Sequence, residues 1–362
     1  MSQSTPARPT TTQPGAVTSR TGAPRRGRFR TLTPVATVAL ASLALAACSP
    51  AASGSAGDAS AEATTASAEA PSRIVGVSSD VSDMALLLAG PERVAAVSES
   101  SRSPHMGMVP DLARQVEGTI PAGVEPDAEQ ILTHAPDLVL TTARHAGERS
   151  VGDQLADAGV ESLALASDDF ATPESYADAL VRVGEALGEE DAAAQHADDL
   201  LTEIQEIDDA EAADASADGD GPRVLALMAR GGTVMAMDGG LMLPGLAVRA
   251  GAVDAAAVTA GPEDGGPPPP ARVVGIAGTA PLDAELLVKA DPDILLLEDF
   301  MGTGEEPFAD LLGSEAVAQV PAVADDEVHL VPMTEASAVA GIHLPDGYRT
   351  VAGIVSAASA AD

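Results

Sequence analysis

The sequence predicts an α/β fold in which two pseudo-symmetric lobes with mainly parallel sheets are joined by one long α-helix. Short apolar runs alternate with segments of helical spacing, a pattern typical of parallel sheets covered by helices. The segment DAEQILTHAPDLVL at 127–140 returns as DAELLVKADPDILL at 283–296. A stretch with few helix breakers lies between the two copies. These observations indicate an internal repeat of one lobe, with a helix between the two copies.

The first lobe is expected over residues 73–171. It opens with RIVGVS, an apolar run that ends in small polar residues, as a buried strand followed by a turn does. Asp127 is a suitable helix cap, and Pro136 marks the end of the helix that follows it. Strands are predicted at 73–78, 93–99, 137–142 and 160–165, and helices at 81–90, 128–135 and 151–159.

The connecting helix is expected over residues 172–208. Thr172 followed by Pro and Glu is a strong helix start, and only Gly184 and Gly188 interrupt the helical pattern after it. At 1.5 Å per residue such a helix spans roughly 50 Å, which is longer than a crossover between neighbouring strands needs. This segment is therefore predicted to join the two lobes.

The second lobe is expected over residues 209–362. The strand RVLALM, the helix LMLPGLAVRAG and the strand AVDAAAVT repeat the order found at the start of the first lobe. An acidic, proline-rich loop at 261–275 follows, and then the second copy of the helix–turn–strand segment. The strand EVHLVP and a helix at 346–360 complete the lobe.

The amino-terminal region has the pattern of an export signal. A cluster of arginines at 25–30 precedes the apolar run 31–47, which ends in Leu-Ala-Ala directly before Cys48, the single cysteine. A basic region, an apolar region and small residues before a cleavage point make a secretory signal peptide, here 1–47. Residues 48–72 contain no large apolar residue and are predicted to be a flexible tether.

Composition excludes several classes of partner and activity. The formal net charge is −36 and aromatic residues make up 2% of the chain. Such a chain repels nucleic acid and anionic lipid, and it offers few rings for base stacking. The metalloprotease, dithiol, nucleophile-elbow and phosphate-loop motifs are all absent from the sequence. We therefore expect no enzyme and no intrinsic cofactor.

This organisation resembles the substrate-binding lipoproteins of ABC importers for iron chelates and cobalamin. The resemblance rests on RIVGVS, the repeated segment, VGDQLADAGV, AVAQVPAVADDEVHLV and the lone Cys48 after Leu-Ala-Ala, which is similar to a lipobox. ARGG after RVLALM, AGAVDAAA and PDLVLTTARHAGERSVGDQL are most similar to the haemin-binding branch. That branch often has a tyrosine two residues before the arginine of ARGG, where this chain has Met228 before Arg230.

The resemblance implies a monomeric receptor on the outer face of the cell membrane, held there only by a lipid on Cys48. It would capture an iron chelate, above all haem, between its lobes and deliver it to a dimeric permease with its ATPase. One exposed carboxylate per lobe, Glu129 and Glu285, would dock onto the permease. A glutamate in a first helical turn is also favoured by the helix dipole alone, which is the simpler explanation of both residues.

Ligands of open α/β sheets lie beyond the carboxyl ends of the strands. Arginine pairs carboxylates through two hydrogen bonds, which suits haem propionates or anionic siderophores. His145 is the expected ligand of the iron, because neutral imidazole commonly binds iron. The expected ligand-binding residues are Ser79, Arg102, His105, Arg144, His145, Met228, Arg230 and Met301.

Two alternatives remain open from the sequence. Within the same family the ligand would be a ferric siderophore or cobalamin, with no bond between protein and iron. From another class, the chain would be a secreted α/β module that binds a protein through an exposed apolar patch.

Overall fold

The structure is a computed structural model that describes residues 70–214, 221–256 and 279–360, apart from Val124, His145 and Ala338. The described residues belong to one compact unit. Within them no helix is long and apolar enough to cross a membrane. The predicted signal peptide 1–47, Cys48 and most of the tether 48–72 lie outside the described residues.

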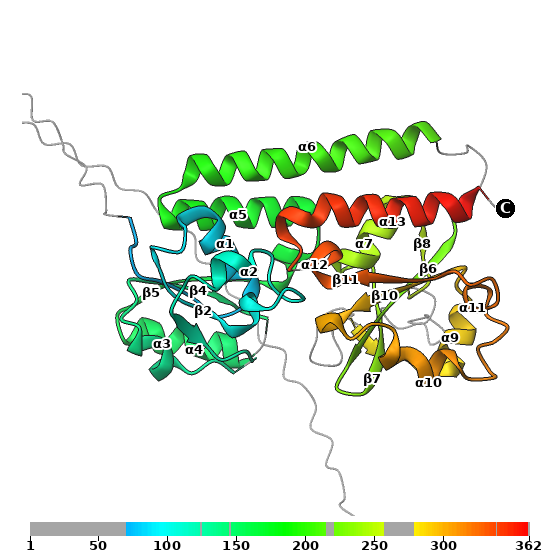
Figure 1. The fold of residues 1–362 in the computed structure, drawn as a ribbon, viewed down its shortest axis with the longest axis horizontal. Helices are drawn as coiled ribbons and strands as arrows, with labels where there is room; N and C mark the ends of the chain where they lie inside the picture. Colours follow the sequence, from blue (N-terminus) through cyan, green and yellow to red (C-terminus); the bar gives the residue numbers. More distant parts are fainter. Residues whose placement is uncertain are drawn as a thin grey trace, which may run out of the picture. The chain divides into compact units, whose positions relative to one another are not determined.

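The first lobe is built on a five-stranded parallel sheet (Figure 1). Its order β3-β2-β1-β4-β5 places the opening strand of the lobe at the centre. Gly76 ends β1, and a Cβ at this position would lie 2.6 Å from the Cα of Ser82, so helix α1 packs directly on the strand end. The elements are β1 (Ile74–Gly76), α1 (Ser79–Ala89), β2 (Val94–Ser98), η1 (Glu99–Arg102), α2 (Pro110–Ala113), β3 (Gly118–Ile120), α3 (Ala128–Thr133), β4 (Leu138–Thr142), α4 (Ala146–Asp157), β5 (Glu161–Leu165) and η2 (Ser167–Phe170).

The second lobe contains a six-stranded mixed sheet. Its path is β11-β10-β6-β7-β9, and β8 pairs separately with the start of β6. The parallel strands β8-β6-β10-β11 repeat the arrangement β2-β1-β4-β5 of the first lobe. The elements are β6 (Arg223–Arg230), β7 (Thr233–Met237), α7 (Met242–Arg249), β8 (Val253–Asp254), β9 (Thr279–Pro281), α9 (Ala284–Ala290), β10 (Ile294–Asp299), η3 (Phe300–Gly302), η4 (Glu306–Phe308), α10 (Ala309–Leu312), α11 (Pro321–Ala324), β11 (Val328–Pro332), α12 (Met333–Ala336), η5 (Gly341–His343) and α13 (Leu344–Ser359).

The hairpin of β6 and β7 departs from the simple repetition that the sequence suggested. After Arg230 the chain turns through Gly231 and Gly232, which both have positive φ, and returns as β7 antiparallel to β6. A two-residue Gly-Gly turn is typical of such hairpins. β7 takes the edge of β6 beyond its first two residues, so β8 pairs only with Arg223 and Val224.

The repeated segment forms the same structure in each lobe. Asp127 and Asp283 each cap their helix by accepting hydrogen bonds from backbone N–H groups of its first turn. At the other end of the segment, Asp137 accepts the backbone N–H of Arg73 at 3.0 Å, and Asp293 accepts that of Arg223 at 2.8 Å. The two arginine side chains donate to backbone carbonyls just before these aspartates: His134 and Ala135 in one lobe, Ala290 and Asp291 in the other. We call each set a strand clamp, because it joins the starts of two neighbouring central strands.

The connecting segment is a helical hairpin, and its second helix leads to the second lobe. Helix α5 (Pro173–Leu187) ends at Gly188 in the left-handed conformation, and α6 (Glu190–Asp214) runs back along it (Figure 1). The prediction of one unbroken helix over 172–208 was therefore wrong, because glycine at this position ends a helix without steric cost. One long helix, α6, still leads from the first lobe to the second, and the predicted fold class is confirmed.

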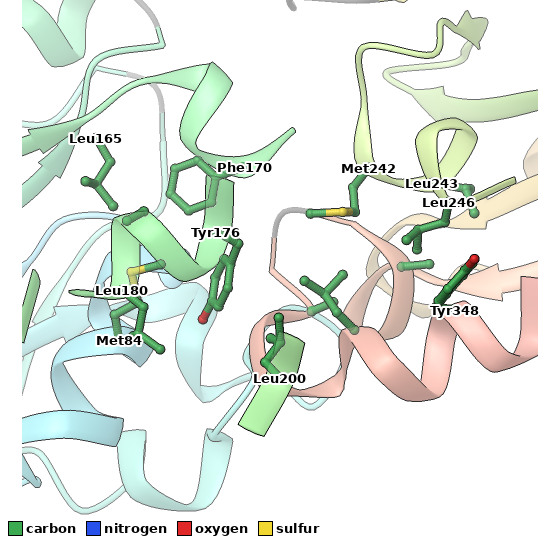
Figure 2. Packing of buried hydrophobic residues seen from close by; sticks show 14 of the residues in the cluster. Met84, Leu165, Phe170, Tyr176, Leu180, Leu200, Met242, Leu243, Leu246 and Tyr348 are labelled. Atoms are coloured by element: carbon green, nitrogen blue, oxygen red, sulfur yellow. The ribbon is translucent and has the colours of Figure 1, made fainter. Parts of the chain in front are cut away.

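The largest hydrophobic cluster joins the lobes through these helices. It includes Met84 and Leu180 on the first-lobe side, Leu200 on α6, and Leu246 and Tyr348 on the second-lobe side (Figure 2). The two outer faces have their own smaller clusters. Because the helices share one core with both lobes, burial of apolar surface holds the strand ends of the two sheets near each other.

Candidate functional site

A cavity of about 200 Å³ lies at the carboxyl ends of central strands and is lined by both lobes. The first lobe contributes residues that follow β4 and β5, and the second contributes residues from β6, β7, β10 and the loops near them. We call it the interlobe cavity. Its apolar lining consists of Phe170, Met228, Met237, Leu241, Met242, Leu243, Phe300, Met333 and Val339, and its polar lining of Arg144, Ser167, Thr279, Glu298 and Ser337.

Arg144 is the cationic group among the described residues that line this cavity. It follows β4, and its Nη1 lies 2.6 Å from Oδ2 of Asp80, whose side chain is only 3% exposed. Burial alone would lower the pKa of the guanidinium, but the charges of Asp80 and Glu148 raise it above its ordinary value. Its Nε is buried and has no hydrogen-bond partner among the described residues. Arg144 is thus held in place as a cation, and one of its N–H groups is left without a partner in the described part of the chain.

An arginine stacks on a phenylalanine in each lobe. The guanidinium of Arg144 lies 5.5 Å from the ring centre of Phe170, and that of Arg230 lies 5.6 Å from the ring centre of Phe300. Both rings line the interlobe cavity, whereas Arg230 is exposed beside it. Stacking on a ring orients a guanidinium without using its N–H groups, so these remain available to an anion.

Glu298 is a carboxyl group inside the apolar wall. It lies near the end of β10, directly opposite Met228 on β6, and it is 4% exposed. Burial raises its pKa from 4.5 to about 7, and a hydrogen bond with Ser337 works in the opposite direction. The hydroxyl of Ser337 itself donates to the carbonyl of Met333 at 2.8 Å.

Of the residues predicted to bind ligand, Arg144 and Met228 line the interlobe cavity. Ser79 is buried beside Asp80, and Arg102 donates to the carbonyls of Val116 and Glu117. Ser79, Arg102, His105, Arg230 and Met301 lie outside its lining and stay predictions as ligand contacts.

His105 is exposed, and its ring lies against Gly302 of the second lobe: a Cβ at Gly302 would lie 2.5 Å from the His105 Nδ1. Met301, beside that glycine, is 51% exposed and has a φ of 63°. His145, the expected iron ligand, lies outside the described residues, so its role stays a prediction. Among the described residues no group of three or more His, Cys, Asp or Glu side chains is arranged to hold a metal ion.

Several cavity residues were not among the expected ligand-binding residues. Phe170, Met242 and Met333 belong to short helices and were indistinguishable from core residues by pattern. Glu298 carried a visible signal, because it is a charged residue that directly follows the buried run Ile-Leu-Leu-Leu. A charge at the end of a fully buried strand marks the ligand edge of an α/β sheet.

Glu129 and Glu285 occupy equivalent places in the two lobes. Each lies in the first turn of its helix, α3 or α9, and is exposed. Neither makes a hydrogen bond or ion pair through its side chain in the part of the chain that is described.

Comparison with known proteins agrees with this architecture. A family model described as periplasmic binding protein matches residues 74–333. The search of curated proteins gave no significant match.

Three solved structures have the same fold. The apo form of the periplasmic heme-binding protein RhuT from Roseiflexus sp. RS-1 is 22% identical, with a TM-score of 0.62 over 79% of this chain and 98% of that chain. A periplasmic heme-binding protein from Pseudomonas aeruginosa is 21% identical, with a TM-score of 0.60 over 79% and 93%. The periplasmic vitamin B12 binding protein BtuF of Vibrio cholerae is 15% identical, with a TM-score of 0.59 over 80% and 98%. With the match to the family model over most of its length, the chain belongs to the periplasmic binding protein family.

Proposed function

We propose that the protein is an extracytoplasmic receptor that captures an iron chelate, with haem as the leading ligand, in the interlobe cavity and hands it to an ABC permease. The observation that carries the proposal is the cavity wall, which combines methionine and phenylalanine side chains with the oriented cation Arg144. Haem has an apolar ring and two carboxylates, and such a wall matches both parts of it. The family supports binding and not catalysis, so transport energy would come from a partner ATPase.

The character of the cavity favours haem over the other chelates of the family. A siderophore or cobalamin presents many amide and hydroxyl groups, which lose hydrogen bonds when they enter an apolar cavity. Nine of the fourteen described residues that line this cavity are apolar, and four of these are methionine. A ferric siderophore or cobalamin is therefore the second candidate.

The size of the cavity implies movement on binding. Its volume of about 200 Å³ is below the ~300–1,000 Å³ of typical small-molecule sites. A macrocycle would enter only if the lobes separate, and the contact between His105 and Gly302 is one that separation would break. The shared helical core limits the movement to a modest one.

Anchoring and docking complete the proposal. Cys48 would carry the lipid, and Glu129 and Glu285 would meet arginines of the two permease subunits. Their equivalent, exposed positions support a symmetric contact. The helix caps and strand clamps give structural roles to Asp127, Asp283, Asp137 and Asp293, which leaves the two glutamates as the repeated acids available for docking.

An absorbance titration with haemin tests the ligand. We expect a saturable Soret shift at one equivalent. Arg144→Ala should weaken binding about tenfold or more through loss of a charged hydrogen bond, and Arg349→Ala, which removes an exposed arginine on α13, should not. Circular dichroism would verify that both variants are folded. His145→Ala should move or abolish the shift if His145 binds iron. Absence of a saturable shift in the unchanged protein would overturn haem, and ferric siderophores would be tested next.

A further inference from the structure

Glu298 introduces an anionic oxygen donor into a wall whose other potential metal donors, among the described residues, are thioethers and neutral hydroxyls. Among the described residues that line the interlobe cavity, it is the one carboxyl group. It is 4% exposed and in register with Met228, so the two side chains lie on neighbouring strands at the same level. Neighbouring strands are about 4.8 Å apart, which places the carboxyl and thioether within reach of one bound atom.

Burial of this acid has a cost that packing does not explain. A carboxyl group in an apolar wall loses its hydration, and the hydrogen bond to Ser337 replaces only part of it. Arg144, the cation of the cavity, is already paired with Asp80. A leucine or methionine at position 298 would suit the wall better, since its neighbours on β10 are Leu297, Leu296 and Leu295. A polar group kept under such conditions indicates contact with a ligand.

Ferric iron is a hard cation that prefers anionic oxygen over thioether sulfur. Thioethers suit soft metal ions, and carboxylates suit hard ones. Thr279, Ser167 and Ser337 also line the cavity, but their hydroxyls are far weaker acids than a carboxyl group. Glu298 is therefore the best oxygen ligand that the described part of the cavity offers.

We propose that the Glu298 carboxylate is a protein ligand of the ferric iron of the bound chelate, next to Met228. This inference rests on the proposed function and deepens it. The step is a ligand exchange: the neutral acid gives its proton to the hydroxide carried by haemin iron, water leaves, and an iron–oxygen bond to Glu298 forms. The iron stays ferric, and no electron is transferred. Met228 contributes packing against the ring rather than the anionic bond.

Two porphyrins that differ only in the metal test the inference on the purified protein. Haemin and metal-free protoporphyrin IX share the ring and both propionates, so the cavity wall and Arg144 treat them alike. Glu298→Gln keeps the shape of the side chain and removes the anionic oxygen. We expect this variant to bind haemin about tenfold or more weakly and to change its Soret and charge-transfer bands, as losses at metal sites commonly do. Its affinity for protoporphyrin IX should stay within about twofold of that of the unchanged protein.

A matched control is Asp83→Asn, because Asp83 is also a buried carboxyl whose pKa is raised to about 7, but it lies outside the cavity lining. It should leave both affinities and the iron spectrum unchanged. Equal losses of haemin and protoporphyrin IX in Glu298→Gln, or no loss of either, would overturn the inference and leave the proposed function standing. Failure of the unchanged protein to bind either porphyrin would overturn the proposed function and the inference with it.

Discussion

The two lobes are nearly identical at the starts of their central strands and different at the ends. At the starts, the strand clamps of Arg73 with Asp137 and of Arg223 with Asp293 use the same atoms and the same kind of turn. Even the residues with positive φ, Ala135 and Asp291, coincide at a φ of 47°.

At the strand ends the first lobe presents the buried ion pair of Arg144 with Asp80, whereas the second presents an apolar wall with the acid Glu298. The β6–β7 hairpin adds two of the methionines of that wall, Met228 and Met237, and has no counterpart in the first lobe. The comparison teaches that the duplicated sequence encodes the scaffold that both lobes share. The residues that line the interlobe cavity come from positions at which the two copies differ.

The largest expected effect is a difference in stability between variants of the two arginines beside the cavity. Arg144→Ala should lower the free energy of unfolding by about 3 kcal/mol, because it leaves the buried carboxylate of Asp80 without its cation. Arg230→Ala should cost no more than about 0.5 kcal/mol, because Arg230 is exposed. Urea denaturation followed by circular dichroism would measure both. Equal losses would contradict the distinction between a built-in ion pair and a surface cation.

A pH-dependent effect should come next in size and concerns one buried acid in each lobe. The pKa of Glu298 is raised from 4.5 to about 7 by burial, so between these values the unfolded chain has released a proton that the folded chain retains. Stability therefore falls as the pH rises through this window, by about 3 kcal/mol in all. Glu298→Gln has no such proton, and its stability relative to the unchanged protein should rise from pH 4.5 to pH 8. Asp83→Asn should show the same trend, because burial also raises the pKa of Asp83 to about 7.

Denaturation midpoints of these two variants at pH 4.5 and pH 8 would measure the effect. A difference between variant and unchanged protein that is independent of pH would show that the carboxyl group titrates alike in the folded and unfolded chain. A pH-dependent difference for only one of the two variants would sharpen the comparison, since it would show that only that lobe contains a buried acid with a raised pKa.

The smallest expected effect is a difference between the two strand clamps in how much each contributes to the free energy of unfolding. Asp293 is partly buried and Asp137 is exposed, so water replaces the lost hydrogen bonds more completely at Asp137. We expect Asp293→Ala to cost about 2 kcal/mol and Asp137→Ala about 1 kcal/mol. Urea denaturation would measure both. A larger cost at Asp137 would mean that the first lobe depends more on its clamp than the second does.

The sequence contained most of the fold and only part of the site. Alternating patterns and the repeat predicted the two sheets, because strand and helix periods are local properties. The break at Gly188 was missed because helical, alanine-rich sequence continues on both sides of it. Tertiary packing favours the break, because Gly184 leaves room for the side chain of Ala193 and so lets α5 and α6 pack closely as a pair. The strand β7 was missed although Thr-Val-Met-Ala-Met after Gly-Gly has the composition of a hairpin strand.

Cavity-lining residues were predictable where they lie near strand ends. Arg144 and Met228 were predicted in this way and line the interlobe cavity, and their role as ligand contacts stays a prediction. Phe170, Met242 and Met333 could not be found, since they reach the cavity through the placement of helices from distant parts of the chain. Arg102 also follows a strand but does not line the cavity, because its side chain donates hydrogen bonds to the backbone of its own lobe.

The partners of α6 also have a consequence for the order of assembly. Its first half packs on α5, its neighbour in the chain, and Ala193 touches Gly184 there. Its second half meets the last helix, α13, through Asp208 with Tyr348 and Glu203 with Arg349. Local pairs form early and distant ones late. During synthesis from the amino terminus, the buried face of α6 around Ile204 and Ile207 is therefore completed only after α13 has been made, and a nascent protein without α13 exposes that apolar face to water.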